Sequence, residues 1–318
     1  MDYKDFFGCE LPLVCMPMNG VSDIAFAMNV CDAGVFPSLS SQMFLISKSP
    51  TPIGDRIIRD FDKFATKFNH CRLMFSMTNQ FLIKNYDLIL KLILKYGLSH
   101  IELVVMENED FYYSSEQGLK QRIIELRSIG LKILYKTLSF NKNFRLSEFD
   151  DIDGFVIKGM EGAGKINPKI KPLQELVVLG RNTYPSAALV PSGGVGDSED
   201  VRILMSLGAT AIGIGTLFAV SKESRISEET KMKMLSYNKD HLDVLKADNL
   251  PQNSIVFSKF NEEDDNNNTR SLYAGIRGDG GHIFAGKGIT KINELLSIRE
   301  IAERLVPTVG LEPTLRRF

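Results

Sequence analysis

The sequence lacks the signatures of several common types of catalytic site. It has only four histidines, and its histidine, cysteine and acidic residues show no metal-ligand spacing. It contains no G-x-S-x-G motif and no Walker loop. A metalloenzyme, a serine hydrolase and a P-loop nucleotide hydrolase are therefore all disfavoured.

The chain also has few cysteines and no excess of charge of one sign. The four cysteines, Cys9, Cys15, Cys31 and Cys71, form no C-x-x-C pair, and their apolar neighbours suit reduced thiols in a cytoplasmic protein. The chain has 38 basic and 39 acidic residues, a net charge of −1, and no basic stripe with interleaved aromatics. We therefore expect no nucleic-acid partner.

Long hydrophobic runs are absent as well. Charged residues at positions 2, 4, 5 and 10 interrupt any apolar segment of the signal-peptide type. The apolar segment 81–96 carries several lysines and an aspartate, so we expect an amphipathic helix on a core and not a membrane span. No membrane partner is expected.

What is present is a regular alternation of strand-like and helix-like segments. Apolar residues at three- and four-residue spacing predict helices over Asp23–Asp32, Phe81–Tyr96, Ser114–Ile129 and Ser198–Leu207. This alternation predicts an α/β fold of parallel strands, a (β/α)₈ TIM barrel, with an open doubly wound sheet as the alternative. The eight apolar runs that read as strands are Leu11–Met16, Val35–Ser38, Leu73–Met77, His100–Val105, Lys132–Thr137, Gly154–Ile157, Ala187–Pro191 and Ala211–Ile214.

The pattern changes after the eighth strand. Ser221–Leu245 reads as polar and helical, Asn261–Thr269 as a solvated loop, and Tyr273–Gly288 is dense in glycine. Ile292–Leu305 reads as a closing helix. We therefore predict a barrel formed by residues 1–220 and 291–306, a cap or lid formed by 221–290, and a C-terminal tail at 307–318.

Two neighbouring strand-like runs end in glycines. Val190–Val195 reads V-P-S-G-G-V, and Ala211–Phe218 reads A-I-G-I-G-T-L-F. Exposed backbone N–H groups at two adjacent strand ends can hold a phosphate, and barrels often bind phosphate after their seventh and eighth strands. The alternative is that these glycines serve only the geometry of two tight turns.

Polar residues at other strand ends are candidates for chemistry, because all strand ends of a barrel face one side. The first strand leads into Pro17-Met18-Asn19-Gly20, the third into Thr78 and Asn79, and the fifth ends in Lys136 and Thr137. Lys136 and Lys158 could each stabilise an anion or a developing negative charge. The alternative for both lysines is an ammonium that reaches solvent.

The sixth strand leads into the richest segment, Lys158–Lys165, which reads K-G-M-E-G-A-G-K. Lys165 could donate a proton or clamp a charge, with a solvated loop residue as the alternative. Glu161 could act as a base, or it could cap the loop by accepting from glycine N–H groups. His282 lies in the glycine-rich part of the cap and could overhang the barrel mouth.

Four motifs in order resemble one known family. P-M-N-G-V-S at 17–22 is similar to the family's P-M-A-G-V-S, and G-M-E-G-A-G at 159–164 is similar to G-x-E-A-G-G. S-G-G-V at 192–195 with G-I-G-T-L-F at 213–218 resembles A-G-G-I with Q-M-G-T-R-F, and A-G-K-G at 285–288 resembles A-G-Q-G. The family is that of nitronate monooxygenase (2-nitropropane dioxygenase) and the flavin-dependent enoyl-acyl carrier protein reductases. The resemblance runs from about residue 8 to about 306.

The resemblance implies an FMN-binding barrel and assigns cofactor-binding roles. The phosphate would lie at Gly193, Gly194, Gly215 and Thr216, with Gly213 beside them. Pro17, Met18 and Asn19 would back the flavin ring. The other residues that the resemblance and the strand ends place near the ring are Thr78, with Asn79 as a substitute, Lys136, Lys158 and Ala163.

One departure from the family changes what the resemblance implies about the reaction. The family motif continues with a catalytic histidine, where this chain has Lys165. A lysine has no acceptor atom and stays protonated near neutral pH unless it is buried. The chain is thus predicted to be an FMN-dependent oxidoreductase that acts on a small, anionic molecule other than a nitronate. The catalytic candidates are Lys165, Lys158 and Glu161.

Several alternatives stay open at this point. The chain could be an NAD(P)H-dependent enoyl-thioester reductase, a non-catalytic FMN-binding protein, or a barrel that binds a sugar or nucleotide phosphate without flavin. NAD(P)H and dioxygen are the candidate electron partners. A homodimer is left open.

Overall fold

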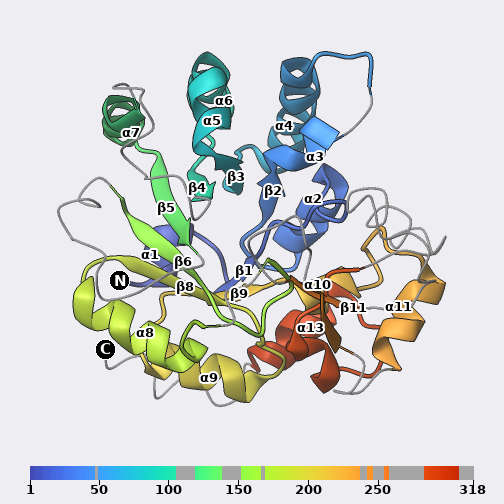
Figure 1. The fold of residues 1–318 in the computed structure, drawn as a ribbon. Coiled ribbons are helices and arrows are strands. Elements are labelled where there is room, and N and C mark those ends of the chain that lie inside the picture. The colour runs from blue at the N-terminus through green and yellow to red at the C-terminus, as the bar shows by residue number, and fades with distance from the viewer. Residues whose placement is uncertain are drawn as a thin grey trace.

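Eight parallel strands form a nearly closed barrel, as predicted (Figure 1). The computed structural model describes residues 1–46, 49–104, 119–137, 152–165, 169–236, 242–245, 254–257 and 283–307. The order around the barrel is β1-β9-β8-β6-β5-β4-β3-β2, which excludes an open doubly wound sheet. The strands are β1 (Leu13–Cys15), β2 (Ser38–Ser40), β3 (Met74–Thr78), β4 (His100–Val104), β5 (Lys132–Thr137), β6 (Gly154–Lys158), β8 (Ala188–Ser192) and β9 (Ile212–Ile214).

The barrel closes between β1 and the residues just before β2. The Cys15 N–H donates to the Phe36 carbonyl at 2.8 Å, and the Phe36 N–H donates to the Leu13 carbonyl at 2.9 Å. The second strand was predicted at Val35–Ser38 but begins at Ser38. Pro37 has no N–H to donate, so regular pairing with β3 starts only after it.

Helices surround the barrel. In Figure 1, α4 to α7 extend outward from one side of the ring of strands, and α8 and α9 lie on the opposite side. No helix in the described part of the chain is long and apolar enough to cross a membrane. The helices are α1 (Tyr3–Phe7), α2 (Ile24–Asp32), α3 (Ser41–Ile46), α4 (Ile53–Phe68), α5 (Asn79–Lys84), α6 (Tyr86–Tyr96), α7 (Leu119–Ser128), α8 (Leu173–Thr183), α9 (Ser198–Ser206), α10 (Thr216–Ala219), α11 (Glu228–Leu235) and α13 (Ile298–Leu305), with a 3₁₀ turn η3 at Lys287–Lys291.

The predicted helix Phe81–Tyr96 is in fact two helices. Asn85, between α5 and α6, has a non-helical backbone with φ −123° and ψ 28°. Its side-chain amide donates to the Phe81 carbonyl at 2.9 Å, which satisfies the end of α5 and lets the chain change direction. The prediction failed because the apolar spacing continues across the break.

The segment after β9 also differs from its prediction. Ser221–Leu245 was predicted to be helical, but among its described residues only Glu228–Leu235 (α11) is an α-helix, and Leu242–Leu245 is strand β10. β10 pairs antiparallel with β11 (Ser254–Phe257), and β11 pairs antiparallel with β7 (Gly164–Lys165). In L-D-V-L the apolar and polar residues alternate only over 242–244, which is too short a run to predict a strand. The predicted loop 261–269, His282 and the tail from 308 lie outside the described residues.

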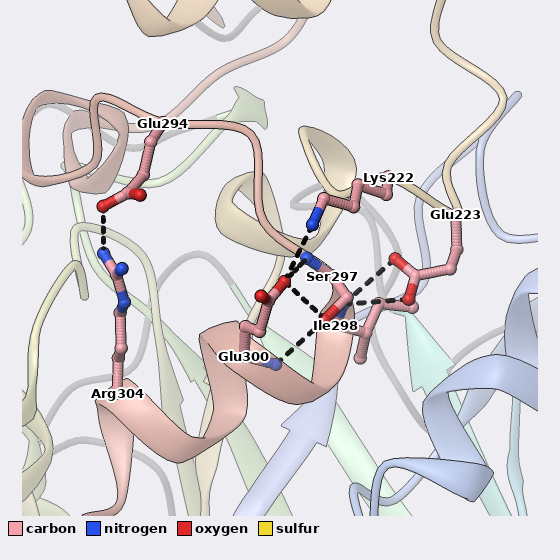
Figure 2. A network of polar contacts seen from close by, with 7 residues as sticks. All are labelled: Lys222, Glu223, Glu294, Ser297, Ile298, Glu300 and Arg304. Carbon is pink, nitrogen blue, oxygen red and sulfur yellow. Dashed lines mark hydrogen bonds and ion pairs between the residues drawn. The ribbon is translucent and has the colours of Figure 1, made fainter.

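A polar network fixes the start of α13 (Figure 2). The Ser297 hydroxyl accepts from the Glu300 N–H at 3.2 Å, and the Glu300 carboxylate accepts from the Ser297 N–H at 2.7 Å, which is a capping box. Lys222 pairs with Glu300 at 3.1 Å, and the Glu223 carboxylate accepts from the Ile298 N–H at 3.0 Å. The helix was predicted from residue 292 but begins at 298, where these caps form. Its buried face packs in the same core cluster as β1 and β9.

Helix α1 closes the bottom of the barrel around a buried histidine. The His100 ring lies among Phe6, Phe7 and Phe36, with ring centroids 4.8–5.2 Å apart. Its Nε2 lies 3.0 Å from the Phe6 carbonyl, and its Nδ1 lies 2.8 Å from the Ser99 hydroxyl. Because a carbonyl only accepts, Nε2 carries the proton and Nδ1 accepts from Ser99. Burial is the main cause that lowers the pKa of His100 to about 3, so this ring stays neutral.

The neutral state of His100 predicts a loss of stability in acid. Between pH 6.5 and about 3, the unfolded chain binds a proton at His100 that the folded chain does not, so the free energy of unfolding falls as pH falls. The loss should reach about 2 kcal/mol between pH 7 and 5. His100→Gln keeps a donor for the Phe6 carbonyl and removes the titration. Urea unfolding of both proteins at pH 7, 6 and 5 should show a steeper decline for the wild type, whereas parallel declines would contradict this assignment.

Candidate active site

A cavity of about 670 Å³ opens at the C-terminal ends of the strands. Its volume lies within the usual range of ligand sites, about 300–1,000 Å³. Its lining includes every residue that the sequence predicted as cofactor-binding: Pro17, Met18, Asn19, Thr78, Lys136, Lys158, Ala163, Gly193, Gly194, Gly213, Gly215 and Thr216. These residues come from six segments of the sequence (17–19, 78, 136, 158–163, 193–194 and 213–216), which the fold brings to one mouth. Among the described residues that line it there are two lysines and no carboxylate.

The glycines on one side of the cavity serve two different purposes. Gly193 and Gly194 have φ of +105° and +85°, the left-handed region that favours glycine. A Cβ on Gly193 would lie 2.9 Å from Gly162 Cα, and a Cβ on Gly194 would lie 2.6 Å from Glu161 Oε2. These two glycines therefore let the loops after β6 and β8 pack together, as the backbone-geometry alternative expected.

Gly215 is different because it has room. A Cβ there would meet nothing nearer than Met18 Sδ at 3.9 Å and Met16 Cβ at 4.0 Å. Gly215 precedes α10, and the first N–H groups of a helix have no acceptor within the helix. Close packing does not explain this glycine, and its backbone is open to the cavity.

Segment 285–288 contacts the loops that follow β6, β8 and β9. The Gly286 N–H donates to Thr216 Oγ1 at 2.8 Å, and the Lys287 N–H donates to the Glu161 carbonyl at 3.0 Å. The Lys287 ammonium pairs with Glu161 Oε1 at 2.8 Å. A Cβ on Gly288 would overlap the Val195 carbonyl. The glycines of A-G-K-G thus allow three loops to meet at the mouth of the barrel.

The predicted base Glu161 does not line the cavity, and the side chain of Lys165 is not among those that the structure describes. Glu161 is not among the lining residues, and its half-exposed carboxylate faces Lys287. The carboxylate thus ties its loop to segment 285–288 through Lys287, a partner that differs from the glycine N–H groups of the alternative stated above. Lys165 has its backbone in β7, paired with Ser254 of β11, and its side chain lies outside the described part of the structure.

Each strand-end lysine of the cavity has a close polar partner in the fold. Lys136 is 17% exposed and its ammonium lies 2.9 Å from Glu102 Oε1 on the neighbouring strand β4. The Lys158 ammonium donates to the Ala163 carbonyl at 2.6 Å, which ties the end of β6 to the loop that follows. The solvent alternative is therefore wrong for Lys136, and both lysines line the cavity.

Sequence reasoning missed some polar residues of this site. Glu102 is fully buried in β4, and the only signal for it was one acidic residue inside an apolar run. Ser40, at the end of β2, donates to Asn19 Oδ1 at 3.1 Å and so orients the loop after β1.

Of the two predicted residues after β3, Thr78 lines the cavity and caps α5 by accepting from the Phe81 N–H at 3.2 Å. Asn79, its suggested substitute, is buried in the first turn of α5 and does not line the cavity.

The lining suits a flat aromatic group that carries a phosphate. Backbone groups at the ends of β8 and β9 form one wall, and the lining contains Lys158 and Lys136, the second paired with Glu102. Met16, Met18, Met77 and Phe284 offer polarisable apolar surface for a ring. The residues present therefore fit a flavin mononucleotide.

Comparison with protein families gives a match to a model described as nitronate monooxygenase, over residues 88–308. This confirms the resemblance drawn from the sequence motifs, although the P-M-N-G-V-S motif lies before the matched region. A dehydrogenase from Rhodococcus jostii, named for (3aS,4S,5R,7aS)-5-hydroxy-7a-methyl-1-oxo-octahydro-1H-indene-4-carboxyl-CoA, is 22% identical over 178 residues. That match covers 56% of this chain and 49% of the dehydrogenase, about half of its length.

Solved structures share the whole architecture. FabK from Thermotoga maritima superposes with a TM-score of 0.74 at 18% identity, covering 95% of this chain and 93% of FabK. A nitroalkane oxidase from Streptomyces ansochromogenes gives 0.69 at 16% identity, covering 95% of this chain and 96% of the oxidase. The enoyl reductase domain of MlnA from Bacillus amyloliquefaciens gives 0.67 at 11% identity, covering 95% and 94% of the two chains. At these identities the likeness establishes the fold.

Proposed function

Because the chain belongs to the nitronate monooxygenase family and is therefore an oxidoreductase, we propose that it binds FMN at the barrel mouth and acts on a small anionic molecule. One observation carries this proposal. The glycine-bearing ends of β8 and β9 border the same cavity as Lys158 and Lys136, and the one carboxylate that pairs with Lys136, Glu102, lies behind the lining. Such a cavity attracts anions at one wall and stacks an aromatic ring at the other.

The residues of the cavity divide the task of holding the cofactor. Gly193, Gly194, Gly215 and Thr216 hold the phosphate, with Gly213 beside them. Pro17, Met18 and Asn19 support the ring, and Thr78, Lys136, Lys158 and Ala163 surround it. FMN supplies the redox chemistry, while the protein supplies position and charge.

Lys165 is proposed to hold the anionic substrate in place of the acid–base group that a histidine would provide. Its backbone forms a three-stranded sheet with β11 and β10 of the segment 221–290. This pairing supports the proposal that 221–290 is a cap, because it connects that segment to the loop that carries Lys165. Lys158 contributes a second positive charge at the end of β6.

A second candidate function is an NAD(P)H-dependent reductase of enoyl thioesters. Two comparisons favour it: one relative is named as a dehydrogenase of a carboxyl-CoA compound, and one structural neighbour is an enoyl reductase domain. Both functions use the same cavity and cofactor. They differ in the electron partner, which is dioxygen in the first and NAD(P)H in the second.

The absorption spectrum of the purified protein, followed by anaerobic addition of NADH or NADPH, separates these functions. We expect flavin bands that persist with nicotinamide and bleach with an anionic substrate. Bands that bleach with nicotinamide would favour the reductase, and enoyl thioesters would be tested next. Absence of flavin bands after incubation with FMN would contradict both candidates.

Localisation and oligomeric state are separate proposals. The four cysteines outside C-x-x-C pairs favour a cytoplasmic enzyme. Gel filtration would test for a homodimer.

Lys165→His is expected to change the turnover of a nitronate or enoyl substrate at least tenfold, since an acid–base group contributes about 10²–10⁴ to rate. The FMN dissociation constant should change by less than about threefold, because residue 165 is assigned to the substrate and not to the cofactor. Lys171→His makes the same exchange at an exposed position, paired with Glu175 at 3.2 Å, and should leave turnover unchanged. Equal turnover in all three proteins would show that residue 165 does not face the substrate.

A further inference from the structure

Beneath the cavity lies an ion pair that the family motifs do not contain. Glu102 is 0% exposed and is the only carboxylate among the fully buried described residues. Its Oε1 lies 2.9 Å from the Lys136 ammonium and accepts from the Ser76 hydroxyl at 3.4 Å. Its Oε2 has no hydrogen-bond partner among the described residues. One carboxylate oxygen thus carries all of its contacts.

The strand register explains how this pair forms. Ser76 on β3 stands beside Glu102 on β4, and Glu102 stands beside Leu134 on β5. Lys136 is two residues further toward the mouth, and its side chain reaches the Glu102 carboxylate on the neighbouring strand. Lys136 and Ser76 line the cavity, whereas Glu102 does not. The Glu102 carboxylate therefore contacts two residues that line the cavity, although Glu102 itself does not line it.

The energetic cost of this arrangement argues for a purpose. A buried ion pair often contributes nothing to stability compared with apolar residues of the same size, because both charges lose their hydration. An apolar residue at 102 would continue the apolar run of β4. What the pair does supply is a fixed position and a compensated charge for one cation at the floor of the cavity.

We propose that Glu102 is a positioning residue of the active site, whose carboxylate holds the Lys136 ammonium at the cavity floor and offsets its positive charge. This inference rests on the proposed function, since it takes the cavity to hold FMN. From the sequence, Lys136 was a candidate to stabilise an anion or a developing negative charge, with an ammonium that reaches solvent as the alternative. The structure assigns it half of a neutral pair, so the positive field on the cofactor from β5 is weaker than the sequence implied.

A set of three variants separates the charge of the pair from its shape. Relative to the wild type, Glu102→Gln raises the net charge at the floor by one, Lys136→Met lowers it by one, and the double variant restores it. With FMN bound, the reduction potential should be higher in Glu102→Gln, lower in Lys136→Met, and close to the wild-type value in the double variant. A positive charge near the ring favours the reduced, more anionic flavin.

The matched control is Asp153→Asn. Asp153 pairs with Arg127 at 3.0 Å and lies just before β6, at the end of the barrel away from the cavity. Losing this pair should lower the melting temperature but leave the potential unchanged. A merely structural role for Glu102 would give the same result as this control.

Melting temperatures of the purified proteins test the pair independently of the cofactor. Lys136→Met leaves a buried carboxylate without its cation, so it should lower the melting temperature most, and adding Glu102→Gln should recover part of that loss. If no protein in the set binds FMN, the proposed function fails, while the melting series still decides whether the pair exists.

An unchanged potential in Glu102→Gln with FMN bound would overturn the proposal. If Glu102→Gln does not fold, the comparison between Lys136→Met and the double variant still decides. The double variant should have the higher potential of those two, and equal potentials would also overturn the proposal.

Discussion

Replacing Gly215 with aspartate is expected to abolish FMN binding while the barrel stays folded. Gly215 lines the cavity, and an added Cβ would meet no atom nearer than Met18 Sδ at 3.9 Å. The new carboxylate would stand where we place the cofactor phosphate. Two like charges about 4 Å apart repel by about 4 kcal/mol at an effective dielectric of about 20, a roughly thousandfold loss of affinity. The measurement is the FMN dissociation constant, from quenching of flavin fluorescence.

Gly215→Ala is the control, because it adds volume without charge and should weaken FMN binding far less. Thermal melting of both variants should stay close to the wild type. Gly194 is a poorer choice for this experiment, since its φ is +85° and a Cβ there would lie 2.6 Å from Glu161 Oε2. Any loss of FMN at Gly194 would mix strain with repulsion. Retained FMN in Gly215→Asp would show that the phosphate lies elsewhere.

Gly154→Ala is expected to be the most destabilising of the glycine-to-alanine changes in the barrel wall, at about 2–3 kcal/mol. Gly154 begins β6 and is buried, and its backbone pairs with Ala188 of β8. An added Cβ would lie 2.7 Å from Ala188 Cβ and would press on the Ala188 backbone. Strands held at a fixed spacing cannot separate for one methyl group without losing hydrogen bonds elsewhere.

Gly54→Ala is the opposite case in the same chain. Gly54 lies in the first turn of α4, and an added Cβ would meet nothing within 4 Å. The free energy of unfolding should rise by about 0.5–1 kcal/mol, because alanine restricts the unfolded chain. Urea unfolding of the two variants should therefore shift the midpoint in opposite directions. A shift of the same sign and size in both would contradict the packing argument at Gly154.

The sequence was a good guide to the strands because their apolar runs are short, buried and bounded by polar residues. All eight predicted strands exist, and the largest error, at β2, is due to Pro37. The helices were predicted less completely than the strands. The prediction omitted α4, although Ile57, Phe61 and Phe64 form a buried stripe at helical spacing. It also omitted α8, which follows Pro172. It merged α5 with α6, since a single asparagine makes the break.

For the candidate site, too, some features could be predicted from the sequence and others could not. The glycine motifs and the strand-end lysines were visible in the sequence, because their residue types stand out at the ends of apolar runs. The contacts of Glu161 and Lys136 were not visible, because their partners Lys287 and Glu102 lie 126 and 34 positions away. Only the folded barrel brings them together. Sequence alone could name the charged groups but not which of them neutralise one another.

The aromatic cluster around His100 has a consequence for how the protein is made. Phe6 and Phe7 belong to the core although they stand at the start of the chain. Translation that began at Met16 or Met18 would yield a polypeptide without α1 and without β1. Its barrel would have an open bottom, and β9 would lose the strand with which it pairs. Loss of these residues would therefore expose apolar core surface and an unpaired strand edge, which favours unfolding and proteolysis.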